Sequence, residues 1–90
     1  MKPFPKPIKV QIVYDGELRK ITGVELEEAL VSEGINFVMF LKFIFDSYPK
    51  IPKLYPPGSI SLLLNGKPPT EFEILNGGDK IEISVSYSVN

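Results

Sequence analysis

Residues 36–48 read NFVMFLKFIFDSY, and they decide the fold because this is the segment whose pattern most clearly predicts a helix. Its large apolar residues recur at spacings of three and four, which places them on one broad stripe of a helix. The stripe comprises Phe37, Leu41, Ile44, Phe45 and Tyr48. Asn36 is suited to cap the first turn, and Pro49 prevents the helix from continuing. We therefore predict one long amphipathic helix that buries a single face.

The opposite side of this helix carries both charged and apolar residues. Lys42 and Asp46 lie four residues apart, which is the spacing of an exposed ion pair. Met39 and Phe43 fall on the same side, where water is expected, and Phe40 lies near the boundary. Large apolar side chains gathered on a solvated face are typical of a binding surface. We predict that Met39, Phe43 and Phe40 form a partner surface; the alternative is that the N-terminal arm or the proline-rich loop covers them.

The residues that precede the helix begin with a strand pattern. Apolar and polar residues alternate from residue 8 to residue 14, and Asp15-Gly16 then supplies a turn. The apolar face consists of Ile8, Val10, Ile12 and Tyr14. Residues 17–23, ELRKITG, fit one turn of helix that Gly23 stops, and the second strand of a hairpin is the competing interpretation.

Residues 24–31, VELEEALV, return to alternation and predict a second strand. We expect Val24, Leu26 and Leu30 to face the core. Glu25, Glu27 and Glu28 are close in the sequence, but Glu25 and Glu27 share the other face of the strand and are typical of a solvated edge.

The residues after the helix predict a loop followed by short strands. A proline-rich loop at residues 51–59 leads to a buried strand at residues 60–64, which the Asn65-Gly66 turn closes. Residues 72–74 offer a further short strand. Residues 75–90, LNGGDKIEISVSYSVN, begin with a glycine turn and then alternate, with no proline to interrupt them. We predict a final strand that runs at least to Tyr87.

This order of elements predicts an α+β fold of the ubiquitin-like β-grasp type, in which one main helix packs on a mixed sheet of four or five strands. Residues 1–7 hold three prolines and are expected to form an extended arm, while residues 8–90 form a single domain. The expected core comprises Ile8, Val10, Ile12, Leu41, Ile44, Phe45, Leu62, Leu64, Ile81 and Ile83.

Composition argues against an enzyme. The chain has no cysteine and no histidine, which removes thiolate nucleophiles, thiolate zinc sites and the usual general base. The remaining carboxylates do not form a constellation, because Asp15 and Asp79 belong to turns. We therefore predict no catalytic residue, no cofactor and no metal site.

Charge and hydropathy narrow the choice of partner. The net charge is −1, and the basic cluster of Lys2, Lys6 and Lys9 is small, so neither nucleic acid nor membrane is expected as a partner. The longest apolar run, residues 37–41, is far too short to cross a bilayer. A cytoplasmic location is expected, because the proline-rich N-terminal residues show no signal-peptide pattern.

Several short motifs follow one another in both halves of the chain. They are Leu18-Arg19, Thr22-Gly23, the acidic strand 25–31, Tyr48-Pro49, Leu64-Asn65-Gly66, Leu75 and Gly78-Asp79. Together they resemble the motifs of the molybdopterin-synthase small subunit and its relatives, the ubiquitin-like sulfur carriers of thiamine and molybdenum cofactor synthesis. The resemblance extends over residues 8–90, and the order and spacing of the motifs are more specific than any single one.

The resemblance implies a β-grasp fold and a function at the tail. Members of this family end in Gly-Gly, and a partner enzyme adenylates the terminal carboxylate, which becomes a sulfur-carrying thiocarboxylate. Val89 and Asn90 occupy the positions of those glycines here, and Gly77-Gly78 lies inside a turn. A side chain at this place is expected to collide with the narrow channel of an activating enzyme.

Three functional hypotheses follow. The first is a β-grasp module that binds a protein partner without activation, the partner being similar to a molybdopterin-synthase large subunit or an activating enzyme, or a second copy of the chain. The second is a working sulfur carrier for molybdenum or tungsten cofactor or thiamine synthesis, with atypical activation at Asn90. The third is an unrelated β-grasp binding module.

Overall fold

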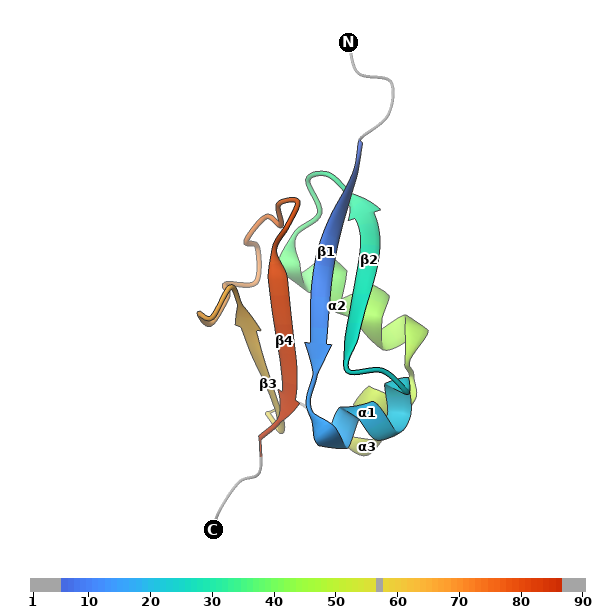
Figure 1. Cartoon of the computed structure of the whole chain (residues 1–90). Helices are drawn as coiled ribbons and strands as arrows, with labels where there is room; N and C mark the ends of the chain where they lie inside the picture. The colour runs from blue at the N-terminus through green and yellow to red at the C-terminus, as the bar shows by residue number, and fades with distance from the viewer. Residues whose placement is uncertain (1–5, 57, 87–90) are drawn as a thin grey trace.

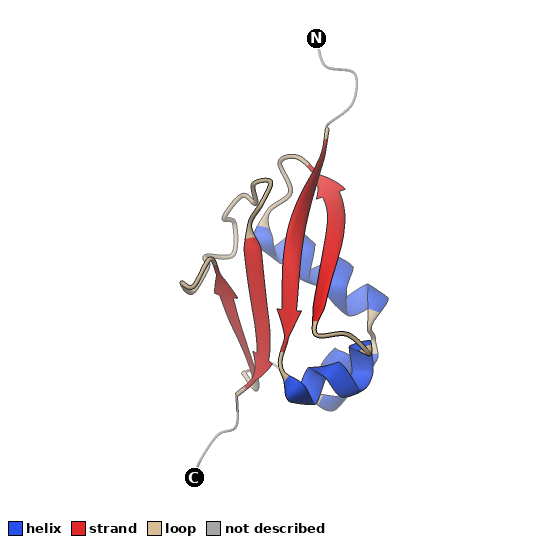
Figure 2. Ribbon diagram, viewed as in Figure 1, coloured by secondary structure: helices blue, strands red, loops and turns tan. Residues whose placement is uncertain are grey.

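The fold is a four-stranded sheet with one long helix across one of its faces (Figures 1 and 2). The computed structural model describes residues 6–56 and 58–86. The strands are β1 (Pro7–Tyr14), β2 (Leu26–Ser32), β3 (Ile60–Leu64) and β4 (Lys80–Val85). The helices are α1 (Gly16–Thr22), α2 (Phe37–Ser47) and α3 (Lys50–Leu54). Helix α2 crosses the sheet, while α1 and α3 lie together beyond the C-terminal end of β1 (Figure 1).

The sheet has the strand order β2-β1-β4-β3. β1 pairs antiparallel with β2 and parallel with β4, and β3 pairs antiparallel with β4. The first and last strands of the described chain therefore lie side by side in the centre, and β2 and β3 form the two edges. A mixed sheet packed on one main helix is the ubiquitin-like β-grasp fold, which confirms the predicted fold class.

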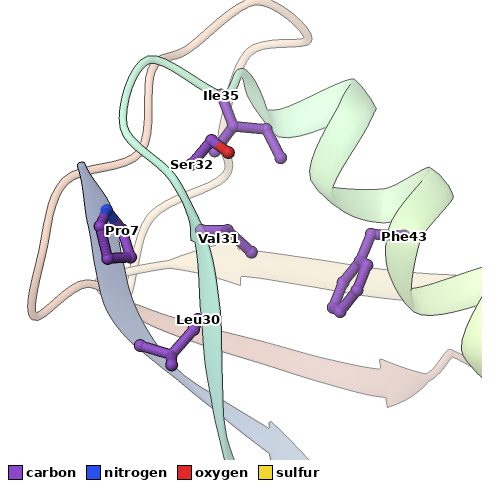
Figure 3. A pocket seen from close by; sticks show the side chains of 6 residues that line it. All are labelled: Pro7, Leu30, Val31, Ser32, Ile35 and Phe43. Atoms are coloured by element: carbon purple, nitrogen blue, oxygen red, sulfur yellow. The ribbon is translucent and has the colours of Figure 1, made fainter. Parts of the chain in front are cut away.

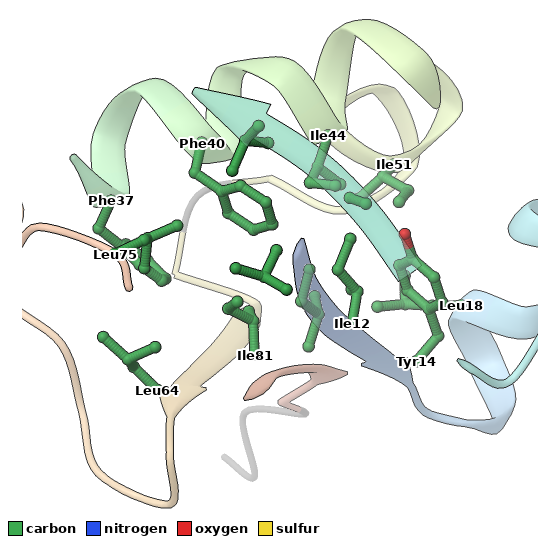
Figure 4. Packing of buried hydrophobic residues seen from close by; sticks show 14 residues of the cluster. Ile12, Tyr14, Leu18, Phe37, Phe40, Ile44, Ile51, Leu64, Leu75 and Ile81 are labelled. Carbon is green, nitrogen blue, oxygen red and sulfur yellow. The ribbon is translucent and has the colours of Figure 1, made fainter. Parts of the chain in front are cut away.

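The core lies between α2 and the sheet (Figure 4). Of the ten residues expected in it, six are fully buried, and Ile8, Leu41, Phe45 and Leu62 are half-buried against it. The buried apolar side chains are Val10, Ile12, Tyr14, Leu18, Ala29, Val31, Phe37, Phe40, Ile44, Ile51, Leu64, Leu75, Ile81 and Ile83. α1, α3 and the segment before β4 each contribute a core residue that the pattern of strands and main helix did not identify.

Helix α2 forms where it was predicted, but its buried stripe is rotated. The Asn36 side chain caps it by accepting a hydrogen bond from the Met39 N–H at 2.9 Å, and Lys42 meets Asp46 at 2.9 Å. Phe40 is 0% exposed, whereas Leu41 is only half-buried. Phe40 therefore belongs to the centre of the core and not to a surface, because Phe37, Phe40 and Ile44 follow the three- and four-residue spacing of a buried face.

The predicted inner face of β2 was wrong. Val24, Leu26 and Leu30 are exposed, and Ala29 and Val31 are buried instead. Apolar residues occupy both faces of this strand, so alternation alone could not choose between them. The pairing register makes the choice, because it sets Ala29 opposite the buried Val10.

Glu27 and Glu28 of β2 and the preceding Glu25 do not form one solvated edge. Glu27 points inward with Ala29 and accepts hydrogen bonds from two tyrosines, Tyr14 and Tyr48. Glu25 and Glu28 are exposed and form ion pairs with Arg19 at 3.3 Å and with Lys9 at 4.0 Å.

The segment between β1 and β2 is a helix, so the hairpin interpretation was wrong. The Asp15 carboxylate caps α1 by accepting from the Leu18 N–H at 2.9 Å, and it also accepts from the Val85 N–H of β4 at 2.7 Å. Gly23 ends the helix with φ 78°, a left-handed conformation that glycine adopts without strain. One side chain thus starts α1 and holds the end of β4.

The predicted proline-rich loop contains the short helix α3. Pro52 is tolerated there because it lies in the first turn, where its missing N–H would have no partner in the helix. The reason for a helix rather than a loop is Ile51, which is 0% exposed and anchors α3 to the core.

The last third of the chain holds fewer strand residues than predicted. Residues 72–74 form no strand but one isolated bridge, between Ile74 and Asn36. The predicted turn after β3 is present, with Asn65 and Gly66 at φ 52° and 84°. β4 ends at Val85, short of the predicted Tyr87, although the Ser86 N–H still donates to the Ser59 carbonyl at 2.6 Å. Residues 87–90, and with them most of the predicted extension, lie outside the described residues, as does Phe4 of the arm.

The rotated stripe of α2 can be tested by two substitutions at neighbouring positions. We expect Phe40→Ala to lower the free energy of unfolding by about 3–5 kcal/mol, because it leaves a cavity in the core. Leu41→Ala, at a half-buried site, should cost less than about 2 kcal/mol. Urea denaturation followed by circular dichroism measures both values. A larger loss for Leu41→Ala than for Phe40→Ala would contradict this register.

Candidate functional site

The exposed side of α2 carries two large apolar side chains. Met39 is 60% exposed and Phe43 is 44% exposed, one turn apart on the same face. We call this pair the α2 patch. The ring of Phe43 lies 6.4 Å from the ring of the buried Phe40, so Phe40 supports the patch from below without reaching the surface. Of the three residues predicted to form a partner surface, Met39 and Phe43 are exposed and Phe40 is not.

Phe43 overhangs a hollow of about 360 Å³ between α2 and β2, which we call the β2 groove (Figure 3). Its lining comes from the start of β1, the end of β2, the turn after it and α2. The residues are Pro7, Leu30, Val31, Ser32, Ile35 and Phe43. Five of these six side chains are apolar, so the groove extends the α2 patch down to the edge of the sheet. The groove joins residues that are far apart in the sequence, and no local pattern predicts it.

A second apolar surface lies on the face of the sheet that points away from α2. The register sets Val13 of β1 beside Leu26 of β2 on one side and Glu82 of β4 on the other, and Glu82 beside Leu63 of β3. These four residues form one row across the whole sheet. Leu26 is 52% exposed, while Val13 and Leu63 are half-buried. Sequence reasoning missed the row because it turned Leu26 toward the core.

A partly buried polar cluster links the sheet to the end of α2. The hydroxyls of Tyr14 and Tyr48 both donate to Glu27 Oε1, at 2.8 and 3.0 Å, and the two rings meet edge to face at 5.9 Å. Burial, followed by the hydrogen bond to Glu27, raises the pKa of both hydroxyls above the ordinary value of 10.0. Both therefore remain protonated donors at neutral pH. The cluster has the character of a structural bridge, because each member is already satisfied by the others.

The raised tyrosine pKa values have a consequence for stability at alkaline pH. Above pH 10.0, the ordinary pKa, the unfolded tyrosines lose their protons while the folded ones keep them. The unfolded state then binds fewer protons than the folded state, so the contribution of these two tyrosines to stability is constant well below this pH and falls as the pH rises further.

The remaining candidate residues from the sequence either have a structural role or lie outside the described residues. Asp79 accepts from the Asn65 side chain at 2.9 Å and from the Asn76 N–H at 2.7 Å, as a turn residue does. Within residues 6–56 and 58–86, no group of three or more acidic side chains is placed to hold a metal ion, and no helix is long and apolar enough to span a membrane. Val89 and Asn90 lie outside the described residues.

Comparison with solved structures identifies proteins that share this fold. No protein-family model matches the chain, and no curated protein matches its sequence. A Pyrococcus furiosus protein assigned as molybdopterin converting factor, subunit 1, superposes with a TM-score of 0.79 at 22% identity, over 89% of this chain and 99% of that one. A structure of small archaeal modifier protein 1 of Haloferax volcanii gives a TM-score of 0.77 at 14% identity, over 89% of this chain and 99% of that one. Small archaeal modifier protein 1 of Methanosarcina acetivorans gives 0.75 at 20% identity, over 94% and 99%. At these identities the likeness shows the shared β-grasp fold.

The bridge made by Glu27 can be tested by removing its acceptor. We expect Glu27→Ala to lower the free energy of unfolding by about 1–3 kcal/mol, because two hydroxyls in partly buried hydrogen bonds lose their acceptor. Glu27→Gln keeps a carbonyl acceptor and should cost less. Thermal and urea denaturation at pH 7 compare the two variants with the parent protein. Equal losses, both below about 0.5 kcal/mol, would show that the cluster does not stabilise the fold.

Proposed function

We propose that this protein is a non-enzymatic β-grasp module, similar to the sulfur carriers, that binds a protein partner without being activated at Val89-Asn90. The observation that carries the proposal is the α2 patch, where Met39 and Phe43 remain 60% and 44% exposed beside an apolar groove. Exposed apolar side chains that adjoin a hollow are typical of protein interfaces. Two of the similar structures support this class of function by their names, one as a subunit of a converting factor and the other as a protein modifier.

The absence of activation is supported by the residues that follow β4. Residues 86–90, SYSVN, contain no glycine, whereas the carriers that the sequence resembles end in Gly-Gly. The Val85 N–H is held by Asp15 and the Ser86 N–H by the Ser59 carbonyl. These two bonds hold the end of β4 in the sheet, directly before residues 87–90. The chain has no histidine or cysteine, which supports a role without catalysis.

The partner we favour is a protein similar to a molybdopterin-synthase large subunit or to an activating enzyme. A sulfur carrier with atypical activation at Asn90 is the second candidate, and the shared fold with the converting-factor subunit favours it. The near-balance of charge, −1 overall, supports a protein rather than a nucleic acid as the partner.

Partner binding can be tested with two variants of the same helix. Phe43→Lys should lose the partner that co-purifies with the native protein, because it puts a charge into the apolar contact. Val38→Lys is the matched control, since Val38 is 43% exposed on α2 but lines a different hollow, beside Leu41 and Leu62. Cross-linking mass spectrometry identifies the partner, and circular dichroism checks that both variants fold. Retention of the partner by folded Phe43→Lys would exclude the α2 patch as its binding surface.

Activation can be tested by mass. The protein is incubated with a carrier-type activating enzyme, ATP and a sulfur donor, and intact-mass spectrometry follows the product. We expect no change, because Val89 is too large for a channel that accommodates glycine. A variant with Val89→Gly and Asn90→Gly is the control that should accept activation. A mass increase in the parent protein equal to the replacement of one carboxylate oxygen by sulfur would restore the sulfur-carrier function.

A further inference from the structure

The outer edge of β2 has unpaired backbone groups. The N–H of Tyr14 donates to the Glu25 carbonyl, and the N–H of Glu33 donates to the Lys6 carbonyl, both at 2.8 Å. In an antiparallel ladder the odd-numbered residues of β2 must therefore face β1, and the even-numbered ones face outward. Among the described residues, the outward N–H and C=O groups of Leu26, Glu28 and Leu30 have no hydrogen-bond partner. We call these three residues the β2 edge.

The other edge of the sheet is less available. Asn65 donates its N–H to Lys80 of β4, so within β3 the outward groups belong to Ile60, Leu62 and Leu64. Leu64 is already paired, because its N–H and C=O both bond to Lys67, at 2.7 and 3.1 Å. β3 is also the shorter strand, with five residues against seven in β2. The β2 edge is thus the longer open ladder.

The β2 edge adjoins apolar surface on both faces of the sheet. On the face toward α2 lies the β2 groove, with Val31 and the overhanging Phe43 (Figure 3). On the opposite face, Leu26 and Leu30 are 52% and 65% exposed, and Leu30 at the edge also lines the groove. An added strand would alternate its side chains between these two faces, and each set would meet apolar atoms. Backbone hydrogen bonds and side-chain burial therefore both favour an extended strand as the ligand.

The negative charge of β2 favours a basic segment over a second copy of the chain as the ligand of the β2 edge. Residues 24–34 contain four glutamates and no lysine or arginine. Glu28 lies between Leu26 and Leu30 on the outer face, and Lys9 reaches its carboxylate only at 4.0 Å, so it can accept from a further cation. A second copy paired antiparallel, with Leu26 opposite Leu30, would set Glu28 opposite Glu28, and like charges directly opposite are destabilising. A basic segment would therefore form an ion pair with Glu28, whereas a second copy would place two carboxylates opposite each other.

We propose that the β2 edge binds an extended segment of a partner protein, added to the sheet as a fifth strand. The segment carries a lysine or arginine opposite Glu28, apolar residues opposite Leu26 and Leu30, and apolar residues that enter the β2 groove beneath Phe43. The proposal rests on the protein-binding function proposed above and gives that partner its chemistry. Backbone bonds to the edge supply affinity, and the lysine or arginine together with the groove supplies selectivity.

The probe is a synthetic peptide, acetyl-KVVKVVVK-amide, titrated into isotopically labelled protein and followed by NMR. We expect shifts concentrated on the amides of Leu26, Glu28 and Leu30 and on the ring of Phe43. N-methylation of the peptide at its second lysine and at the valine two positions later removes two ladder donors and should weaken binding about tenfold or more. Replacement of the lysines by glutamates should also weaken it, by reversing the charge that faces Glu28.

Two variants at position 30 separate the contribution of the backbone N–H to binding from that of the side chain. Leu30→Pro removes an outward N–H, which an edge strand tolerates, and should weaken binding. Leu30→Ala keeps that N–H and should bind more tightly than Leu30→Pro. The amide spectrum of each variant checks that the sheet remains formed.

Binding at the β2 edge and binding of the native partner at the α2 patch are tested by different measurements. No binding of the peptide, or binding that N-methylation leaves unchanged, would overturn the added strand even if Phe43→Lys still loses the native partner. Peptide-induced shifts centred on Val13 and Leu63 would show that the peptide binds the outer face of the sheet, and would overturn binding at the β2 edge. Shifts of the β2 amides that depend on protein concentration without peptide would assign the edge to a second copy instead.

Discussion

The parallel pairing of β1 with β4 is the contact on which the rest of the molecule depends. It joins strands from opposite ends of the described chain, with Ile12 beside Ile81 at the centre of the sheet. Closing so long a loop is entropically costly, and the burial of both strands against α2 offsets the cost. Asp15 secures the same junction with one carboxylate that caps α1 and holds the Val85 N–H. The end of β1, the start of α1 and the end of β4 are thereby fixed together.

This central pair also determines which strands remain at the edges. β1 and β4 each have two neighbours, so β2 and β3 are left with one side open. β3 covers part of its open side by the turn to Lys67, while β2 keeps its outward groups. The same arrangement brings α2 across the sheet and sets Phe43 above the end of β2. The candidate binding surface is therefore a consequence of the topology and not of any motif in the chain.

The inward orientation of Glu27 shows how tertiary contacts can reverse a hydrophobic pattern. A carboxylate on the inner face of a strand is costly unless it is hydrogen-bonded. Tyr14 and Tyr48 supply two donors, and both stay protonated because burial and the carboxylate raise their pKa. With Glu27 satisfied, Ala29 and Val31 enter the core, and Leu26 and Leu30 are turned toward water. The polar cluster thus makes it possible for the register of β2 to leave apolar side chains on the outside of the sheet.

The sequence by itself determined the elements whose signals are local. The alternation of β1, the cap and spacing of α2, Gly23 after α1 and the Asn65-Gly66 turn each depend on residues a few positions apart, and each was predicted correctly. It also identified Met39 and Phe43 as exposed, because the neighbouring Lys42 and Asp46 must face water.

Only the tertiary structure decided the face of β2, the burial of Phe40, the helix α3 and the groove. Both faces of β2 carry apolar residues, and Glu27 becomes an inner residue only through tyrosines that are 13 and 21 positions away. Phe40 is central because α2 packs with this side against the sheet, and α3 forms because Ile51 reaches the core. These outcomes depend on contacts between distant segments, about which the periodicity of a single segment carries no information.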